Sequence, residues 1–214
     1  MKRHLIFDFD ETLVKSKETI YRAVKATGSE LLKIKITDED VSRAWGSPYA
    51  IFIDKVFRIS ESGFDIKEVT KAYRQNIKHI GIHFYNNASE ILKELLEEND
   101  LSILSAGSSK IVREHLDELV FPETNFKHIL GAEDTHFHKP DPRVFNVFFE
   151  MNNSLDRNQV YYIGDSKDDY EAAFGAGLKF IGIDHNKLGT FDKLNTEKVN
   201  NFLELKQKLL NETF

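Results

Sequence analysis

Two aspartates separated by one residue follow an apolar run near the start of the chain. The run is "HLIFDFDETL", residues 4–13, and the acids are Asp8 and Asp10. Residues at i and i+2 of a strand point to one face, so the two carboxylates can lie side by side. Ionised carboxylates at close range repel, and a cation or a shared proton relieves the repulsion. The pair therefore indicates a metal site or acid–base chemistry, or else two acids that cap the following turn.

A second acidic stretch, "YIGDSKDDYEAA" at 162–173, repeats this arrangement. Asp165 follows an apolar run, and Asp168 and Asp169 come directly after it. Taken alone, helix N-capping explains these acids as well as metal binding does. In an open parallel sheet, however, the carboxyl ends of the strands form the ligand site, so the two stretches are predicted to meet.

Two further segments supply groups that bind anions. Lys139 precedes two prolines, which restrict the backbone around it, although a lone loop lysine is commonly only solvated. Ser105, Ala106 and Gly107 follow another apolar run and could expose backbone N–H groups at a helix start. Carboxylates, a lysine and an anion-binding turn together predict a Mg²⁺ ion facing a phosphate group.

The elements that must position these residues alternate between strands and helices. Runs of strand length and composition lie at 4–9, 100–107, 126–131, 160–165 and 178–184. Helical patterns lie at 87–99, 109–119, 141–152 and 168–177. Such alternation predicts an α/β fold, a Rossmann-like open parallel sheet with helices on both faces.

One region departs from that alternation. Residues 16–82 hold several helical patterns and no convincing strand. We expect an α/β core domain from residues 1–15 and 83–214, and an inserted all-α domain over 16–82.

Composition narrows the class of protein. The 214 residues carry a net charge of −6 without a basic run, which argues against nucleic acid as a partner. The absence of cysteine excludes disulfides and thiolate chemistry. Neither a signal-peptide pattern nor a membrane-spanning apolar stretch is present. We expect a cytoplasmic monomer or weak homodimer that binds a small-molecule phosphate ester and no membrane.

The order of these motifs resembles the haloacid dehalogenase superfamily of phosphohydrolases. An Asp-x-Asp-x-Thr stretch comes first, followed by Ser105, Lys139 with its proline, and Gly-Asp-Ser at 164–166. The match covers nearly the whole chain, and the nearest subgroup is similar to phosphoglycolate phosphatase and β-phosphoglucomutase. The family often has glycine after the second aspartate, where this chain has Glu11.

The resemblance implies a role for each matched residue. Asp8 would be the nucleophile and Asp10 the general acid and base. Thr12 would orient their loop, Ser105 with the N–H groups near Ala106 and Gly107 would bind the phosphate, and Lys139 would bridge nucleophile and phosphate. Mg²⁺ would be held by Asp8, the carbonyl of Asp10, Asp165 and Asp169, with Asp168 as a substitute for Asp169.

The resemblance also implies a Mg²⁺-dependent phosphatase whose inserted helical domain is a cap. A phosphomutase and a catalytically idle binding module remain alternatives, whereas Asp10 argues against dehalogenation because no alkoxide would then need a proton. The substrate could be phosphoglycolate or a sugar phosphate. Arg43, at a break between helical patterns, could bind a substrate carboxylate, or it could be solvated on a helix face.

Overall fold

The computed structural model describes residues 2–211, and the chain divides into two compact units. The first unit contains the residues up to Val14 and resumes at Phe84. The second unit is Lys15–His83. Two short strands, β2 (Val14–Lys15) and β3 (His83–Phe84), pair with each other where the chain passes between the units.

The first unit is built on a parallel sheet, which confirms the predicted fold class. Its strand order is β5-β4-β1-β6-β7-β8. The strands are β1 (Arg3–Phe7), β4 (Asn99–Leu104), β5 (His128–Leu130), β6 (Val160–Gly164), β7 (Lys179–Ile183) and β8 (Glu197–Val199). Strand β1 lies between β4 and β6 and is buried from His4 to Phe7, as expected for a strand covered on both faces. The chain order reverses at β1, and such a switch point is where ligands bind in open α/β sheets.

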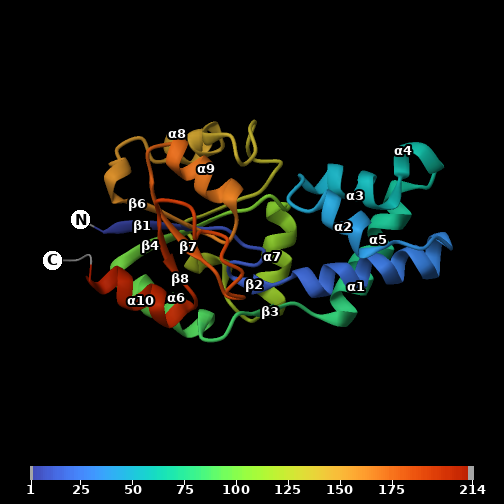
Figure 1. Ribbon diagram of the computed structural model, residues 1–214, viewed down its shortest axis with the longest axis horizontal. Helices are drawn as coiled ribbons and strands as arrows, with labels where there is room; N and C mark the ends of the chain where they lie inside the picture. Colours follow the sequence, from blue (N-terminus) through green and yellow to red (C-terminus); the bar gives the residue numbers. More distant parts are fainter. Residues whose placement is uncertain (1, 212–214) are drawn as a thin grey trace. The chain divides into compact units, whose positions relative to one another are not determined.

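Helices cover both faces of this sheet. Figure 1 shows α8 and α9 on one side and α6 and α10 on the other. The helices are α6 (Ala88–Glu98), α7 (Ser109–Glu118), α8 (Asn146–Met151), α9 (Lys167–Gly175) and α10 (Phe202–Asn211). Short 3₁₀ segments are η2 (Glu123–Asn125), η3 (Pro142–Phe145) and η4 (Arg157–Gln159). The single helix expected at 141–152 is wrong in detail, because the segment starts as η3 behind its N-cap Asp141 and becomes α-helical only at Asn146.

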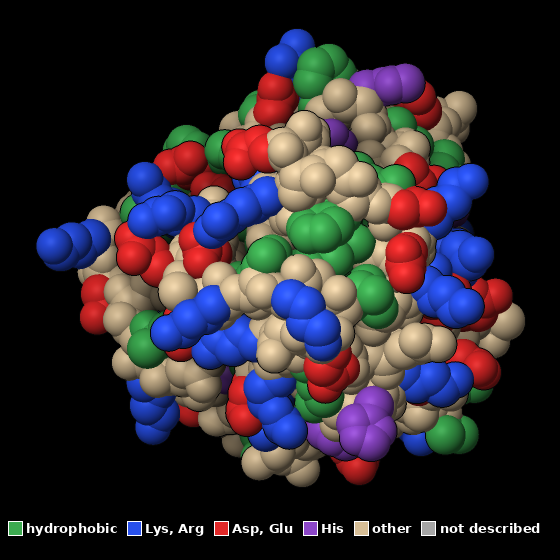
Figure 2. Space-filling view, turned by 90° about the vertical axis from the view of Figure 1, so that its right-hand side faces the viewer, with side chains coloured by type: hydrophobic (Ala, Val, Ile, Leu, Met, Phe, Trp, Pro, Cys, Tyr) green, Lys and Arg blue, Asp and Glu red, His purple; other side chains and the backbone are tan. Residues whose placement is uncertain are grey.

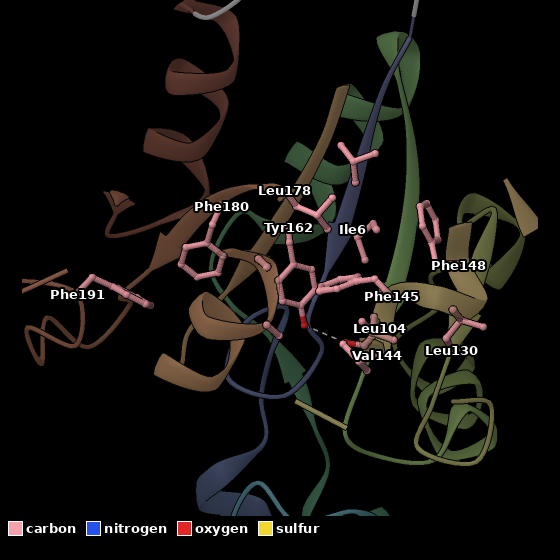
Figure 3. Close-up of a cluster of buried hydrophobic side chains, with 13 residues drawn as sticks. Ile6, Leu104, Leu130, Val144, Phe145, Phe148, Tyr162, Leu178, Phe180 and Phe191 are labelled. Carbon is pink, nitrogen blue, oxygen red and sulfur yellow. Dashed lines mark hydrogen bonds between the residues drawn. The ribbon is translucent and has the colours of Figure 1, made fainter. Parts of the chain in front are cut away.

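Aromatic side chains fill the core beneath α8 and α9. Figure 3 shows Tyr162 at the centre of this cluster, between Phe145 and Phe180. The Tyr162 and Phe145 rings meet edge to face with centroids 5.0 Å apart, an arrangement that aromatic pairs prefer. Unlike its neighbours, Tyr162 carries a hydroxyl, and it therefore needs polar partners inside the core.

The second unit is helical. Its elements are α1 (Lys17–Thr27), the π-helix η1 (Gly28–Leu32), α2 (Asp38–Ala44), α3 (Tyr49–Phe57), α4 (Ile59–Ser62) and α5 (Ile66–Ile80). Helix α1 packs against α5, and the Tyr73 ring of α5 meets Phe57 edge to face at 5.8 Å. A capping box between Thr37 and Asp40 starts α2 and explains where that helix begins.

The surface carries charges of both signs. Figure 2 shows basic and acidic side chains interspersed over one face, around a smaller group of hydrophobic ones. Among residues 2–211, no helix is long and apolar enough to cross a membrane.

Candidate active site

The loop after β1 carries the first pair of aspartates. The Asp8 N–H donates to the Ile163 carbonyl at 2.8 Å, which extends the pairing with β6 by one residue. The chain then turns back on itself, since the Leu13 N–H donates to the Phe9 carbonyl. Glu11 takes the left-handed conformation (φ 60°), which costs a residue with a Cβ roughly 1–2 kcal/mol. Glycine would adopt this backbone conformation without that cost.

Three carboxylates gather at the carboxyl end of the sheet. Asp8, Asp165 and Asp169 each offer an oxygen, and these oxygens lie within 4.8 Å of one another. Asp8 is 5% exposed and Asp169 is 1% exposed. Asp165 follows the end of β6, and Asp169 lies in the first turn of α9, where it forms a capping box with Ser166. Carboxylates at this separation repel one another unless positive charge or a shared proton lies between them.

Lys139 supplies one such charge. Its Nζ donates to Asp8 Oδ1 at 2.6 Å and to Asp169 Oδ1 at 2.6 Å, and its side chain is only 9% exposed. One ammonium beside three carboxylates leaves an excess of negative charge. An oxygen-only donor set with such an excess suits a hard divalent cation such as Mg²⁺.

The pKa values reflect this crowding. Burial raises the pKa of Asp8 to about 7; Lys139 opposes the shift and Asp169 adds to it. Burial also raises the pKa of Asp165, helped by the Asp169 and Asp8 carboxylates. Burial lowers the pKa of Lys139, but the two acids it contacts outweigh burial and hold that pKa well above its usual value. A cation in the cluster would favour the ionised carboxylates.

Of the two adjacent acids at the start of α9, Asp169 is in the cluster and Asp168 is exposed. Both carboxylate oxygens of Asp169 already accept hydrogen bonds. Oδ1 accepts from Lys139 and from the Tyr162 hydroxyl, and Oδ2 accepts from the N–H and hydroxyl of Ser166. In this geometry Asp169 holds the lysine, which fits a supporting role beside a metal better than direct ligation.

The turn after β4 brings the expected anion-binding residues next to Asp10. Ser105 is 5% exposed, and its hydroxyl accepts from the Gly107 N–H at 2.9 Å. A Cβ added to Gly107 would lie 3.7 Å from Asp10 Oδ2, so the turn and this carboxylate are neighbours. Ala106 lies between Ser105 and Gly107 in the same turn.

Thr12 connects the first loop to the second acidic stretch. Its buried hydroxyl donates to Asp165 Oδ1 at 3.3 Å. Its carbonyl lies 3.0 Å from His185 Nε2. The threonine therefore fixes the loop that carries Asp8 and Asp10.

Arg43 belongs to the helical unit. It lies on the exposed face of α2 and pairs with Glu39, one turn earlier. Trp45, at the end of the same helix, is half-buried beside Tyr21, with ring centroids 5.9 Å apart.

Three aromatic residues near the cluster were not expected from the sequence. Tyr162 contacts Lys139 and Asp169, while Tyr85 donates to Glu11 Oε2 at 2.9 Å. His185 stacks on Tyr85 with centroids 3.5 Å apart. No local signal singled out Tyr162, because the adjacent Tyr161 carries the same hydroxyl in the same strand.

Comparison with known proteins agrees with this arrangement. The family model described as haloacid dehalogenase-like hydrolase matches residues 5–183. The chain is 28% identical to a phosphoglycolate phosphatase of Pseudomonas savastanoi pv. phaseolicola, over 85% of this chain and 69% of that protein. It is 27% identical to the pyrophosphatase PpaX of Listeria innocua, over 84% and 82% of the two chains.

Solved structures share the fold. CbbY from Rhodobacter sphaeroides, crystallised in complex with phosphate, superposes with a TM-score of 0.78 at 17% identity, over 96% of each chain. A hydrolase from Pseudomonas syringae gives a TM-score of 0.74 at 19% identity, over 99% of each. With the family model spanning most of the chain and the acid and lysine motifs meeting at one sheet edge, the chain belongs to the haloacid dehalogenase-like hydrolases.

Proposed function

We propose that this protein is a Mg²⁺-dependent phosphatase that hydrolyses a small phosphate monoester through an aspartyl-phosphate on Asp8. The observation that carries the proposal is the contact of Asp8 with Lys139 inside a cluster of acids that also contains Asp165 and Asp169. The presence of Asp10 beside the Ser105–Gly107 turn adds a proton donor next to an anion-binding group.

In the first step, an Asp8 carboxylate oxygen attacks phosphorus and the bond to the ester oxygen breaks. Asp10 gives its proton to the departing oxygen, which leaves as an alcohol. The Ser105 hydroxyl and the N–H groups of its turn bind phosphoryl oxygens, and the Lys139 ammonium offsets their charge.

In the second step, water hydrolyses the aspartyl-phosphate. Asp10, now ionised, takes a proton from the attacking water, and Asp8 leaves as a carboxylate. The same residue thus acts first as acid and then as base.

The residues that would hold Mg²⁺ are Asp8, the carbonyl of Asp10 and Asp165, with Asp169 in a supporting role through its contact with Lys139. The excess of carboxylate over ammonium in this cluster supports that assignment. When bound, Mg²⁺ would supply Lewis-acid stabilisation of charge on the phosphoryl oxygens.

We propose that the inserted unit, residues 16–82, is a cap that excludes water and selects the substrate. The names of two relatives, a phosphoglycolate phosphatase and a pyrophosphatase, suggest small anionic phosphates as substrates. A phosphomutase and an idle binding module are the other candidates, and the intact Asp10 disfavours the second.

The decisive experiment is a substrate panel with purified protein. We expect release of inorganic phosphate from at least one of phosphoglycolate, sugar phosphates, pyrophosphate or p-nitrophenyl phosphate. Chelation by EDTA should reduce turnover at least ~100-fold, and added Mg²⁺ should restore it. Equal rates with and without EDTA would count against the metal, an isomerised sugar phosphate without phosphate release would indicate a mutase, and binding without turnover would indicate a binding module.

Arg43 is the proposed cap contact for an anionic leaving group. Arg43→Ala should lower kcat/KM for the best anionic substrate by roughly 10-fold or more, while p-nitrophenyl phosphate is spared. Arg22→Ala is the matched control, since Arg22 also pairs with an acid one turn earlier on an exposed helix face. If the two variants behave alike on both substrates, Arg43 has no such role.

A further inference from the structure

Tyr162 has no role in the chemistry described so far, although it lies within the charged cluster. Its side chain is completely buried in the middle of β6. We propose that Tyr162 is a positioning residue, whose hydroxyl holds the Lys139 ammonium in place while Asp8 is phosphorylated and dephosphorylated. This inference rests on the proposed function.

A count of hydrogen bonds supports it. A lysine ammonium has three N–H donors. The acceptors around Lys139 Nζ are Asp8 Oδ1 at 2.6 Å, Asp169 Oδ1 at 2.6 Å and the Tyr162 hydroxyl at 3.0 Å. The three donors thus match three acceptors, and Tyr162 is the one uncharged member.

The hydroxyl proton closes the arrangement. Because the Tyr162 oxygen accepts from Lys139, its own proton points to Asp169 Oδ1 at 2.9 Å or to the Leu104 carbonyl at 3.3 Å. Figure 3 shows the latter bond reaching from the aromatic cluster toward β4. With the proton on the shorter of these contacts, the one to Asp169, lysine, aspartate and tyrosine form a closed triangle.

This triangle matters because the Asp8 contact changes during catalysis. When Asp8 carries the phosphoryl group, the negative charge moves from its carboxylate to the phosphoryl oxygens, so the contact between Lys139 and Asp8 Oδ1 changes. Asp169 and Tyr162 are then the remaining fixed partners of Lys139. Without the hydroxyl a single carboxylate would hold the lysine, and an ammonium displaced by even a fraction of an ångström stabilises the transition state less well.

The ring is well suited to the task. Phe145 and Phe180 pack against it, with ring centroids 5.0 Å and 6.3 Å away. This packing restrains the ring so that the hydroxyl stays directed at the lysine. Tyr162→Phe keeps the packing and removes only the hydroxyl.

The preceding residue provides a matched control. Tyr161 is also buried in β6, at 2% exposure, and its hydroxyl accepts from Lys179 Nζ at 2.8 Å. Successive residues of a strand point to opposite faces, so Tyr161 makes an equivalent lysine contact away from Asp8. Tyr161→Phe should leave activity unchanged.

The test compares both variants in kcat, KM and ligand binding. For Tyr162→Phe with p-nitrophenyl phosphate and Mg²⁺, we expect kcat to fall roughly 10- to 100-fold and KM to change less than about threefold. Adding Tyr162→Phe to Lys139→Met should cause little further loss, because a residue that acts through Lys139 has no effect without it. A kcat equal to that of Tyr161→Phe, or additive losses in the double variant, would overturn the proposal.

A binding measurement separates this proposal from the proposed function. Orthovanadate resembles the phosphoryl group, and its binding with Mg²⁺ can be followed by the shift in unfolding temperature without any turnover. Affinity should fall about 10-fold in Tyr162→Phe and not in Tyr161→Phe; equal affinity would overturn the positioning role. If the parent protein hydrolyses none of the esters, only the proposed phosphatase function is refuted, and the vanadate measurement still tests the positioning role. If the Tyr162→Phe protein fails to fold, the hydroxyl is needed for the stability of the core, and the positioning role is also overturned.

Discussion

The two ends of strand β1 bury polar side chains in opposite ways. At the amino end, His4 is 1% exposed, and its Nε2 lies 2.8 Å from the Ser102 hydroxyl. Burial lowers the pKa of His4 to about 4, so the ring is neutral near pH 7. At the carboxyl end, Asp8 is almost as buried but meets a lysine and two further acids.

The difference separates a polar group that serves the fold from one available for chemistry. The Ser102 hydroxyl near His4 also accepts from the His128 N–H at 3.2 Å, and the His128 ring meets Asn152, so the polar groups of this network find their partners within it. The Asp8 cluster is short of positive charge. Excess negative charge in a buried site lowers the stability of the folded protein, and a bound cation would offset that cost.

The largest effect expected is at the carboxyl end. Asp8→Asn should abolish phosphatase turnover, by roughly 10⁴-fold or more, since the nucleophile is lost. In EDTA the variant should be as stable as the parent or more stable, by roughly 1–3 kcal/mol, because one of three crowded carboxylates is gone. Urea unfolding and steady-state rates measure the two quantities. A clear loss of stability would mean that Asp8 serves the fold as His4 does.

A smaller and more selective effect is expected from Asp10→Asn. Turnover of an alkyl phosphate should fall about 10²- to 10⁴-fold, because its poor leaving group needs a proton. With p-nitrophenyl phosphate, whose leaving group needs no proton, the phosphoenzyme should still form but break down slowly. Rapid-quench measurement of a p-nitrophenol burst separates the two steps, and unchanged turnover of the alkyl ester would refute the acid–base role.

The smallest effect is expected at the amino end, on stability alone. The folded pKa of His4 is about 4 and its ordinary value is 6.5. The unfolded chain therefore takes up the proton first, and His4 makes stability fall as pH drops from about 6.5 to 4, by up to about 3 kcal/mol.

His4→Gln should flatten this part of the stability–pH curve relative to the parent and leave turnover at neutral pH unchanged. Urea unfolding at several pH values measures it. Parallel curves for parent and variant would show that His4 is protonated in the folded state as readily as in the unfolded chain. A change in turnover would remove the contrast between the two ends of the strand.

The helical unit shows a third way of placing charges. Its acid–base pairs, such as Arg43–Glu39 and Lys25–Asp38, are exposed on both partners, and such surface pairs contribute little stability. Because these pairs are exposed, a ligand can reach them, whereas the buried Lys139 already donates hydrogen bonds to Asp8 and Asp169.

Much of the fold could be predicted because its signals are local. The apolar runs that became β1, β4, β6 and β7 have strand length, and helical patterns lie between most of them. Strand β8 was missed because two of its three residues, Glu197 and Lys198, are charged and exposed, so no apolar run marks it. The start of the helix after Asp141 was misjudged because the periodicity of side chains does not distinguish a 3₁₀ turn from an α-helical one.

The sequence by itself determined which residue types stand at the ends of β1 and β6, because an acid after an apolar run is visible in the chain. It left open the choice between Asp168 and Asp169. A helix turns by about 100° per residue, so only the packing of α9 on the sheet could decide that Asp169 is buried and Asp168 exposed. Tertiary structure likewise decided the contact between Tyr162 and Lys139, which are 23 positions apart. The order of the strands and the packing of the aromatic core direct the Tyr162 hydroxyl to the ammonium, and no local sequence pattern does so.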